Sequence, residues 1–164
     1  MKIQDYTEEL INLRRHFHQY PELALQEVET SAYIRIYLEK LGYTVTAVEP
    51  TGLIAELPCL KKREKLIVLR AEMDALPIQE QTGLPYASVN QGCMHACGHD
   101  MILAAALILA KIVAEEQETF PVRMRFLFEP AEEIGEGAKR MIQAGALKDP
   151  RPDAFLMFHY AADM

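Results

Sequence analysis

Side chains that can bind a metal or transfer a proton are concentrated in the run 94–100, which reads Met-His-Ala-Cys-Gly-His-Asp. Its two imidazoles, thiol and carboxylate are the groups that bind zinc and its neighbouring divalent ions. Only Gly98 separates Cys97 from His99, and a tight turn at a glycine can direct both side chains inward. The run is therefore a candidate metal site. Nucleophilic chemistry by Cys97 is the alternative.

A second cluster follows at 129–133, which reads Glu-Pro-Ala-Glu-Glu, and His159 comes later on an apolar run. The adjacent pair Glu132 and Glu133 suits two tasks, because one carboxylate can bind a metal while the other takes a proton from metal-bound water. Taken alone, such a pair is typical of a solvated helix start, and His159 of a hydrogen-bonded core histidine. Their joint occurrence with Cys97 and His99 at predicted strand ends favours a metal-hydrolase site.

The composition is that of an ordinary globular chain and argues against several partners. Half of the 164 residues are hydrophobic, the formal charge is −7 and the pI is about 5.3. This acidic balance argues against nucleic acid and anionic membranes as partners. The longest apolar stretch, 101–110, is about half of what a membrane span needs. The basic run 61–63 is typical of a solvated turn.

Cysteine usage indicates a reducing compartment. Three cysteines, an odd and small number, do not suggest a disulfide framework. Cys59 and Cys93 are typical of inert small hydrophobic residues. Residues 1–5 lack the apolar segment of a secretory signal, so we expect a cytoplasmic protein.

Alternating helical and strand patterns predict an α/β layered sheet. Open sheets of this class place ligand sites at the carboxyl ends of their strands, where segments distant in sequence converge. No linker or repeat divides the chain, so we expect one domain. His16 and His18, on the first predicted helix, are typical of surface or packing residues rather than ligands. Helices are predicted over 7–19, 27–41, 100–116 and 136–144, strands over 43–48, 53–57, 66–69, 122–128 and 154–159 (the last one buried), and a loop over 74–93.

Four segments resemble, in order, the motifs of the M20 metallopeptidase family in its amidohydrolase branch. That branch includes N-acyl amino acid amidohydrolases, hippurate hydrolases and auxin–amino acid conjugate hydrolases. Four separate motifs in family order, spread over nearly the whole chain, are a far stronger signal than any one of them. The segments are Arg14-Arg15-x-x-His18-x-x-Pro21-Glu22-Leu23 with Glu27, the run 70–78, the run 94–101, and Pro130-Ala131-Glu132-Glu133 with Gly137-Ala138.

The resemblance implies a role for each candidate site residue. Glu132 would be the general base that activates a metal-held water, which attacks an amide carbonyl and releases an acyl acid and an amino acid. The substrate would be a small N-acyl amino acid, and the cofactors two divalent metal ions, with zinc, manganese and cobalt as candidates. His95 and Asp100 would shape or support the loop. The implied metal ligands are Cys97, His99, Glu133 and His159.

The resemblance also implies a three-layer α/β/α zinc-peptidase-like catalytic domain with a smaller inserted domain that usually dimerises. Family members are much longer than this chain. We therefore interpret residues 1–164 as the N-terminal part of the catalytic domain, without the inserted domain and the C-terminal half that carries a final His ligand. The full-length parent is expected to be a homo-oligomer.

The chain departs from the family pattern at several positions. Glu72 stands where Asp is usual, Glu129 where Gln is usual, and Ile102 where His is common. Glu129 adds negative charge near the site, which is expected to alter metal affinity or to raise the pKa of Glu132.

The leading hypothesis is a metal-dependent amidohydrolase. A second hypothesis is a truncated, non-catalytic remnant that binds metal or a partner, and the departures from the family pattern and the missing half would favour it. A third hypothesis is thiol hydrolysis, with Cys97 as nucleophile and a nearby histidine as base.

Overall fold

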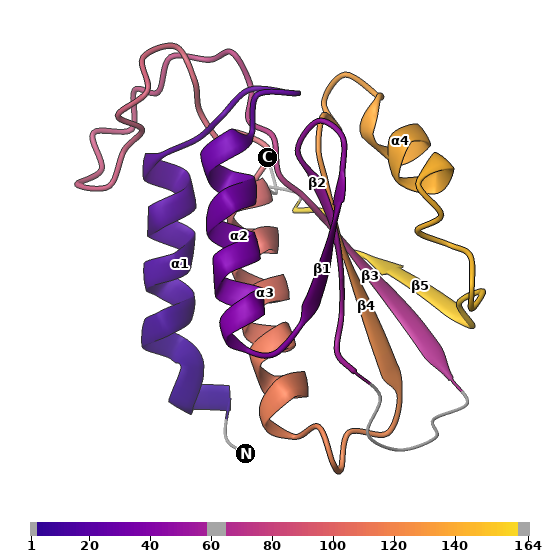
Figure 1. Ribbon diagram of the computed structural model, residues 1–164. Helices are drawn as coiled ribbons and strands as arrows, with labels where there is room; N and C mark the ends of the chain where they lie inside the picture. The colour runs from indigo at the N-terminus through magenta and orange to yellow at the C-terminus, as the bar shows by residue number, and fades with distance from the viewer. Residues whose placement is uncertain (1–2, 59–64, 161–164) are drawn as a thin grey trace.

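The computed structural model describes residues 3–58 and 65–160, which form helices on both faces of one sheet (Figure 1). A short 3-10 helix, η1 (Ile3–Tyr6), leads into α1 (Thr7–Gln19). Together with α2 (Val28–Lys40) and α3 (His99–Glu115), α1 covers one face, while α4 (Gly137–Gln143) lies on the other (Figure 1). This arrangement confirms the expected α/β/α layering.

The sheet is mixed, with strand order β1-β2-β4-β3-β5. β3 pairs in parallel with both β4 and β5, and the β1–β2 hairpin joins β4 in antiparallel fashion. The register aligns Glu72 with Glu129 at the carboxyl ends of β3 and β4. The predicted convergence of strand ends therefore holds for these two strands. The strands are Thr44–Val48, Gly52–Glu56, Leu66–Glu72, Arg123–Glu129 and Ala154–Met157 for β1 to β5.

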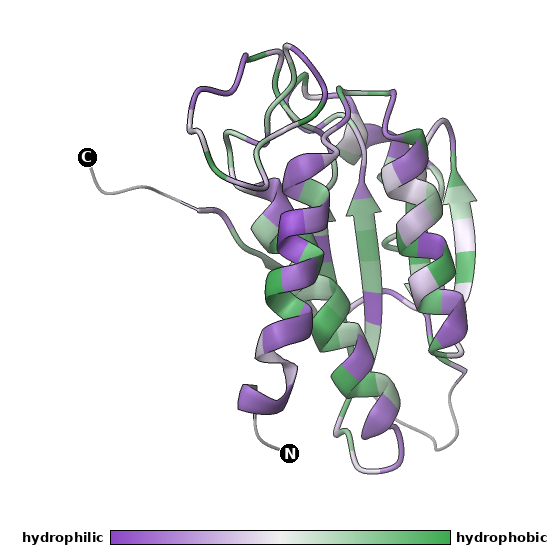
Figure 2. Cartoon of the chain, turned by 90° about the vertical axis from the view of Figure 1, so that its left-hand side faces the viewer, coloured by the Kyte–Doolittle hydropathy of each residue, from purple (hydrophilic) through white to green (hydrophobic). Residues whose placement is uncertain are grey.

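The main core lies between the sheet and the three helices that share its face. Alternate residues of β4 point to opposite sides, so Phe126 packs into this core and Leu127 into a smaller one under α4. β4 is thus buried on both faces, as continuous apolar strands require. In Figure 2 the visible strands are largely green, whereas the helices mix purple and green residues, as expected for amphipathic helices.

The last predicted strand, 154–159, was expected to be buried, and this expectation is wrong. β5 ends at Met157, and all four of its residues are exposed. The reason is its place at the sheet edge, where it pairs only with β3. The other predicted elements are present within a few residues of the expected bounds, and α3 begins at His99 rather than at Asp100. Cys59 and the basic run 61–63 lie outside the described residues.

A long connection joins β3 to α3, and its residues 77–93 are called here the 77–93 loop. Its base is closed by two backbone hydrogen bonds of 3.0 Å between Leu76 and Met94. Just before it, Leu23 and Ala75 form an isolated parallel β-bridge that joins the segment after α1 to the segment after β3. Across the described part of the chain, every helix is too short or too polar to span a membrane.

Candidate metal centre

The turn before α3 directs His99 toward the carboxyl ends of the strands. Gly98 caps the helix with a left-handed φ of 79°, which confirms the tight turn expected between Cys97 and His99. A Cβ at this glycine would lie 3.0 Å from Met101 Cε and 3.2 Å from Tyr160 Cβ. Both the backbone conformation and the close neighbours therefore favour glycine here.

The His99 ring is held by the backbone and directed at two carboxylates. Its side chain is 1 % exposed, and Nδ1 lies 2.8 Å from the carbonyl oxygen of Asp74. Because a carbonyl only accepts, Nδ1 donates, and in the neutral ring the lone pair is left on Nε2. Nε2 faces Glu132 Oε2 at 3.7 Å and Glu133 Oε1 at 3.9 Å. We call His99, Glu132 and Glu133 the His99 cluster.

Buried atoms without a hydrogen-bond partner mark this cluster as a ligand site. Among the described residues, His99 Nε2, Glu133 Oε1 and Glu72 Oε2 are buried and make no hydrogen bond. One ligand atom from each member of the His99 cluster lies within 4.8 Å of the other two. These separations exceed hydrogen-bond lengths and are of the size that separates two ligands of one metal ion. An imidazole nitrogen with two carboxylates therefore fits a divalent cation.

Asp74 fixes the backbone that carries both glutamates. Its Oδ1 and Oδ2 accept the backbone N–H groups of Glu132 and Glu133, each at 3.0 Å. The Glu27 carboxylate accepts the preceding N–H, that of Ala131, at 2.8 Å. Burial raises the pKa of Asp74, although these hydrogen bonds oppose the rise. The sequence prediction assigned Asp74 no role. The sequence feature that could have identified Asp74 is its two-residue spacing from Glu72, because side chains two residues apart in an extended chain point to the same side.

The Cys97 thiol also lies at this site, next to Glu133. The Glu133 carboxylate, together with burial and the negative charge of Glu132, raises the pKa of the thiol to about 11. A nucleophilic cysteine needs a lowered pKa and a basic or positive neighbour. The surroundings of Cys97 are acidic, which weakens the thiol-hydrolysis hypothesis and suits a residue whose thiolate forms only on a metal.

Arg70 places its guanidinium among three carboxylates. Nε lies 2.5 Å from Glu129 Oε2, Nη1 lies 2.6 Å from Glu72 Oε1, and Nη2 lies 3.8 Å from Glu132 Oε1. Burial raises the pKa of Glu72, and the charge of Arg70 opposes that rise. The extra negative charge of Glu129 is therefore paired directly with Arg70.

Two histidines near the site differ in their surroundings. His95 is buried, and neither of its ring nitrogens has a hydrogen-bond partner among the described residues. Burial lowers its pKa to about 4, so the ring is neutral at neutral pH. His159 is exposed, two residues beyond the end of β5, and lies outside the His99 cluster. The next residue, Tyr160, packs beside Gly98, so the chain passes close to the turn, and the ligand role of His159 stays a prediction.

Residues 68–163 match the model of peptidase family M20/M25/M40, which is more than half of the chain. The chain belongs to this family. The expected resemblance is thereby confirmed, and the segment matched contains the whole His99 cluster.

Relatives within the M20 family include acetyl-amino-acid deacetylases. The chain is 45% identical over 166 residues to an N-acetyl-L-cysteine deacetylase of Bacillus subtilis, which covers 100% of this chain and 39% of the relative. It is 39% identical over 160 residues to an N-acetyldiaminopimelate deacetylase of Streptococcus uberis, which covers 95% of this chain and 42% of the relative. The chain thus spans about two fifths of the length of these curated relatives.

The fold matches solved M20 structures. A dinuclear metal-binding M20 peptidase from Bacillus subtilis superposes with a TM-score of 0.89 at 40% identity, covering 99% of this chain and 45% of that one. A second solved structure, from methicillin-resistant Staphylococcus aureus, gives a TM-score of 0.88 at 39% identity, covering 95% of this chain and 41% of that one. The described fold is therefore that of part of an M20 catalytic domain.

Proposed function

We propose that the protein is a metal-dependent amidohydrolase that cleaves the amide bond of N-acyl amino acids. The observation that carries this proposal is the buried His99 Nε2, which has no hydrogen-bond partner among the described residues and faces two adjacent carboxylates. The names of the similar deacetylases support an acetylated amino acid as substrate.

The exposure of the two glutamates supports different tasks for them. The Glu132 side chain is 35% exposed and that of Glu133 16%. Glu132 can therefore reach a water and a substrate, so we assign it the general base, and the more enclosed Glu133 a metal ligand. Arg70 attracts Glu132 Oε1, while Oε2 faces His99. A bound divalent metal would polarise the amide carbonyl and lower the pKa of a bound water.

The finer assignments complete this proposal. Two divalent ions, with zinc, manganese and cobalt as candidates, would be held by Cys97, His99, Glu133 and His159 together with a ligand from elsewhere in the protein. We place the protein in the cytoplasm, where free thiols such as those of Cys93 and Cys97 persist, and expect its full-length form to be a homo-oligomer.

The test is metal-dependent turnover by the full-length protein. Metal is removed with a chelator and restored as zinc, manganese or cobalt, and acetate release from N-acetylcysteine and N-acetyldiaminopimelate is measured. We expect turnover only after metal is restored. Glu132→Gln should lower kcat about 100-fold or more, as loss of a general base does, while zinc affinity changes little.

The matched control is Glu136→Gln, which removes an exposed carboxylate four residues further along the chain. Among the described residues, the Glu136 carboxylate forms an ion pair with Arg140 alone, at 3.7 Å and half-exposed, so its loss should leave turnover unchanged. Metal-independent turnover, or full activity in Glu132→Gln, would overturn the proposal.

A further inference from the structure

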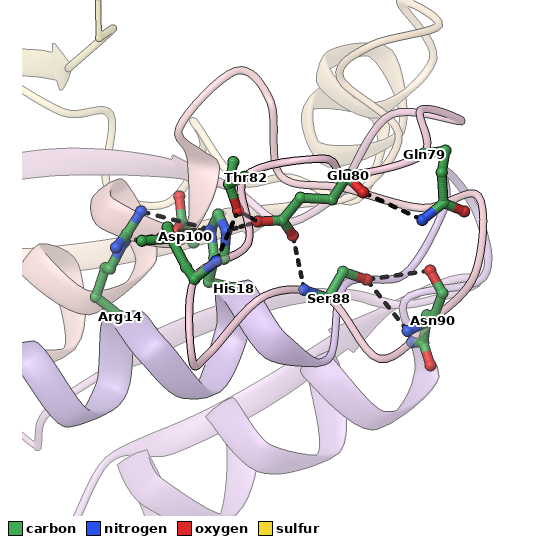
Figure 3. Close-up of polar contacts among 9 residues, drawn as sticks. Arg14, His18, Gln79, Glu80, Thr82, Ser88, Asn90 and Asp100 are labelled. Atoms are coloured by element: carbon green, nitrogen blue, oxygen red, sulfur yellow. Dashed lines mark hydrogen bonds and ion pairs between the residues drawn. The ribbon is translucent and has the colours of Figure 1, made fainter.

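His18, on α1, lies between two carboxylates that come from distant parts of the chain (Figure 3). Nδ1 is 2.8 Å from Asp100 Oδ2, and Nε2 is 3.1 Å from Glu80 Oε1. All three side chains are at most 4% exposed. We call Arg14, His18, Glu80 and Asp100 the His18 network.

Both ring nitrogens of His18 face acceptors, so the ring carries two protons and a positive charge. The hydrogen bond to Asp100 raises the pKa of His18, and the bond to Glu80 adds to the rise, while burial opposes it. A neutral ring could donate to only one carboxylate and would turn the lone pair of its other nitrogen toward an oxygen of the second. The charged ring is therefore what holds the two carboxylates together.

On one side, Glu80 fixes the 77–93 loop. Besides His18, its carboxylate accepts the backbone N–H of Ser88 at 2.6 Å and the hydroxyl of Thr82 (Figure 3). Tyr86, near the middle of this loop, covers the Arg14 guanidinium, which lies 5.2 Å from the centroid of the Tyr86 ring. The Tyr86 ring also contacts the His18 ring in an edge-on arrangement. The loop thus rests on α1 through Glu80 and Tyr86.

On the other side, Asp100 directly follows His99 in the first turn of α3. Its Oδ2 also accepts from Arg14 Nε at 2.8 Å, so two donors from α1 hold it. Burial works against its charged form, but the bond from His18 and the nearby positive charges outweigh this and keep the pKa of Asp100 below its usual value. The turn that directs His99 is therefore fixed to the same imidazole as the loop.

We propose that His18 is a positioning residue that couples the 77–93 loop to the candidate metal ligand His99. This proposal rests on the metal site of the proposed function. Coupling is reciprocal, so a metal bound at His99 should hold the loop closed, and a loosened loop should weaken metal binding by the same factor. Without His18, Asp100 keeps its bond to Arg14, and the hydrogen-bonded bridge from Asp100 to Glu80 of the loop is lost.

The experiment measures zinc affinity and backbone hydrogen exchange on the full-length protein. Zinc dissociation constants come from competition with a chromogenic chelator, and exchange in peptides covering 77–93 is followed with and without zinc. In the wild type, zinc should slow exchange in the loop. In His18→Gln, we expect exchange that zinc no longer slows, and zinc binding weakened by about tenfold, the low end of effects from groups beyond the ligands.

Two further variants separate coupling from a general loss of structure. Glu80→Gln leaves α1 and Asp100 intact, so it should free the loop from zinc-dependent protection even where His18→Gln folds poorly. His16→Gln is the control, because His16 lies on the same helix and stacks on Tyr33 at 4.3 Å. In the described part of the chain, His16 forms no ion pair with the His18 network. This variant should keep both the zinc affinity and the protection of the wild type.

The outcomes distinguish this proposal from the proposed function. Wild-type zinc affinity together with zinc-dependent loop protection in both His18→Gln and Glu80→Gln would overturn the coupling and leave the hydrolase assignment intact. A wild-type protein that binds no zinc would overturn the metal site itself, and the coupling with it.

Discussion

Two polar clusters meet at the consecutive residues His99 and Asp100, and they treat their buried atoms differently. In the His18 network, both nitrogens of the imidazole are paired, and only Asp100 Oδ1 is buried without a partner among the described residues. In the His99 cluster, the ring nitrogen that faces the carboxylates and Glu133 Oε1 are both left without one. The imidazole of the first cluster is fully paired as folded, whereas that of the second faces carboxylates with a nitrogen that the described chain leaves without a hydrogen-bond partner.

This difference indicates which cluster binds a ligand. Burying a polar atom without a hydrogen-bond partner costs about 1–3 kcal/mol, so several such atoms together at strand ends indicate a site that a ligand completes. Charged residues alone are a poorer guide, because the His18 network and the His99 cluster each contain a buried histidine and two carboxylates. Each prediction below alters one side of this comparison.

The largest effect is expected where Arg70 is removed. Arg70→Met leaves Glu72 and Glu129 buried without their shared positive partner, which should lower the free energy of unfolding by about 3–5 kcal/mol. Urea unfolding measures the loss. In the control Arg35→Met, a half-exposed arginine loses its pair with Glu39 at 3.7 Å and its hydrogen bond to the Val45 carbonyl oxygen at 3.4 Å, and a change under about 1 kcal/mol is expected. Equal losses in both variants would contradict the role given to Arg70.

Asp74→Asn should weaken metal binding with a smaller loss of stability. The amide nitrogen of asparagine would face one of the two backbone N–H groups that the carboxylate accepts, so the turn carrying Glu132 and Glu133 would shift. We expect zinc affinity to fall about 10- to 100-fold, as on loss of a group that orients ligands. Calorimetric titration with zinc measures it. Asp5→Asn, at an exposed position of η1, should bind zinc as the wild type does.

The smallest effect is the pH dependence of the His18 network. The raised pKa of His18 means that its contribution to stability is complete below its unfolded value and is lost as pH rises through the folded one. The lowered pKa of Asp100 means that its contribution is complete above its unfolded value and is lost as pH falls through the folded one. Both contribute fully between about pH 3.9 and 6.5, the ordinary values of the two groups.

The measurement is urea unfolding of the metal-free wild type and of His18→Asn from acid to alkaline pH. The wild type should exceed the variant most within that window, and the difference should shrink above it as His18 loses its charge. A difference that stays constant from pH 4 to 9 would show that charge has no part in the contact.

Much of the fold could be predicted because periodic patterns record which faces are buried. The apolar pattern of 100–116 and the continuous run 66–69 both correspond to elements packed on more than one side, α3 and β3. The same reasoning failed for 154–159, because an apolar run shows the capacity to be buried and not the position in the sheet. Strand order places β5 at the edge, and strand order depends on contacts between distant residues.

The site was predictable only as far as residue types allow. Cys97, His99, Glu132 and Glu133 stand out by chemistry and spacing. The structure groups His99 with Glu132 and Glu133 and places Cys97 beside Glu133. The roles of Arg70 and Asp74 depend on the register of β3 with β4 and on backbone N–H groups. His18 was expected to pack or to lie on the surface, because nothing local reveals that Glu80 and Asp100 come to either side of it.

The contact of Tyr86 with the two arginines of α1 has a practical consequence for spectroscopy. Its ring covers Arg14 at 5.2 Å and Arg15 at 4.9 Å, and tryptophan makes this kind of contact at least as well as tyrosine. The chain contains no tryptophan. Tyr86→Trp would therefore introduce a single indole in this sequence, and its emission would report on the position of the 77–93 loop in real time.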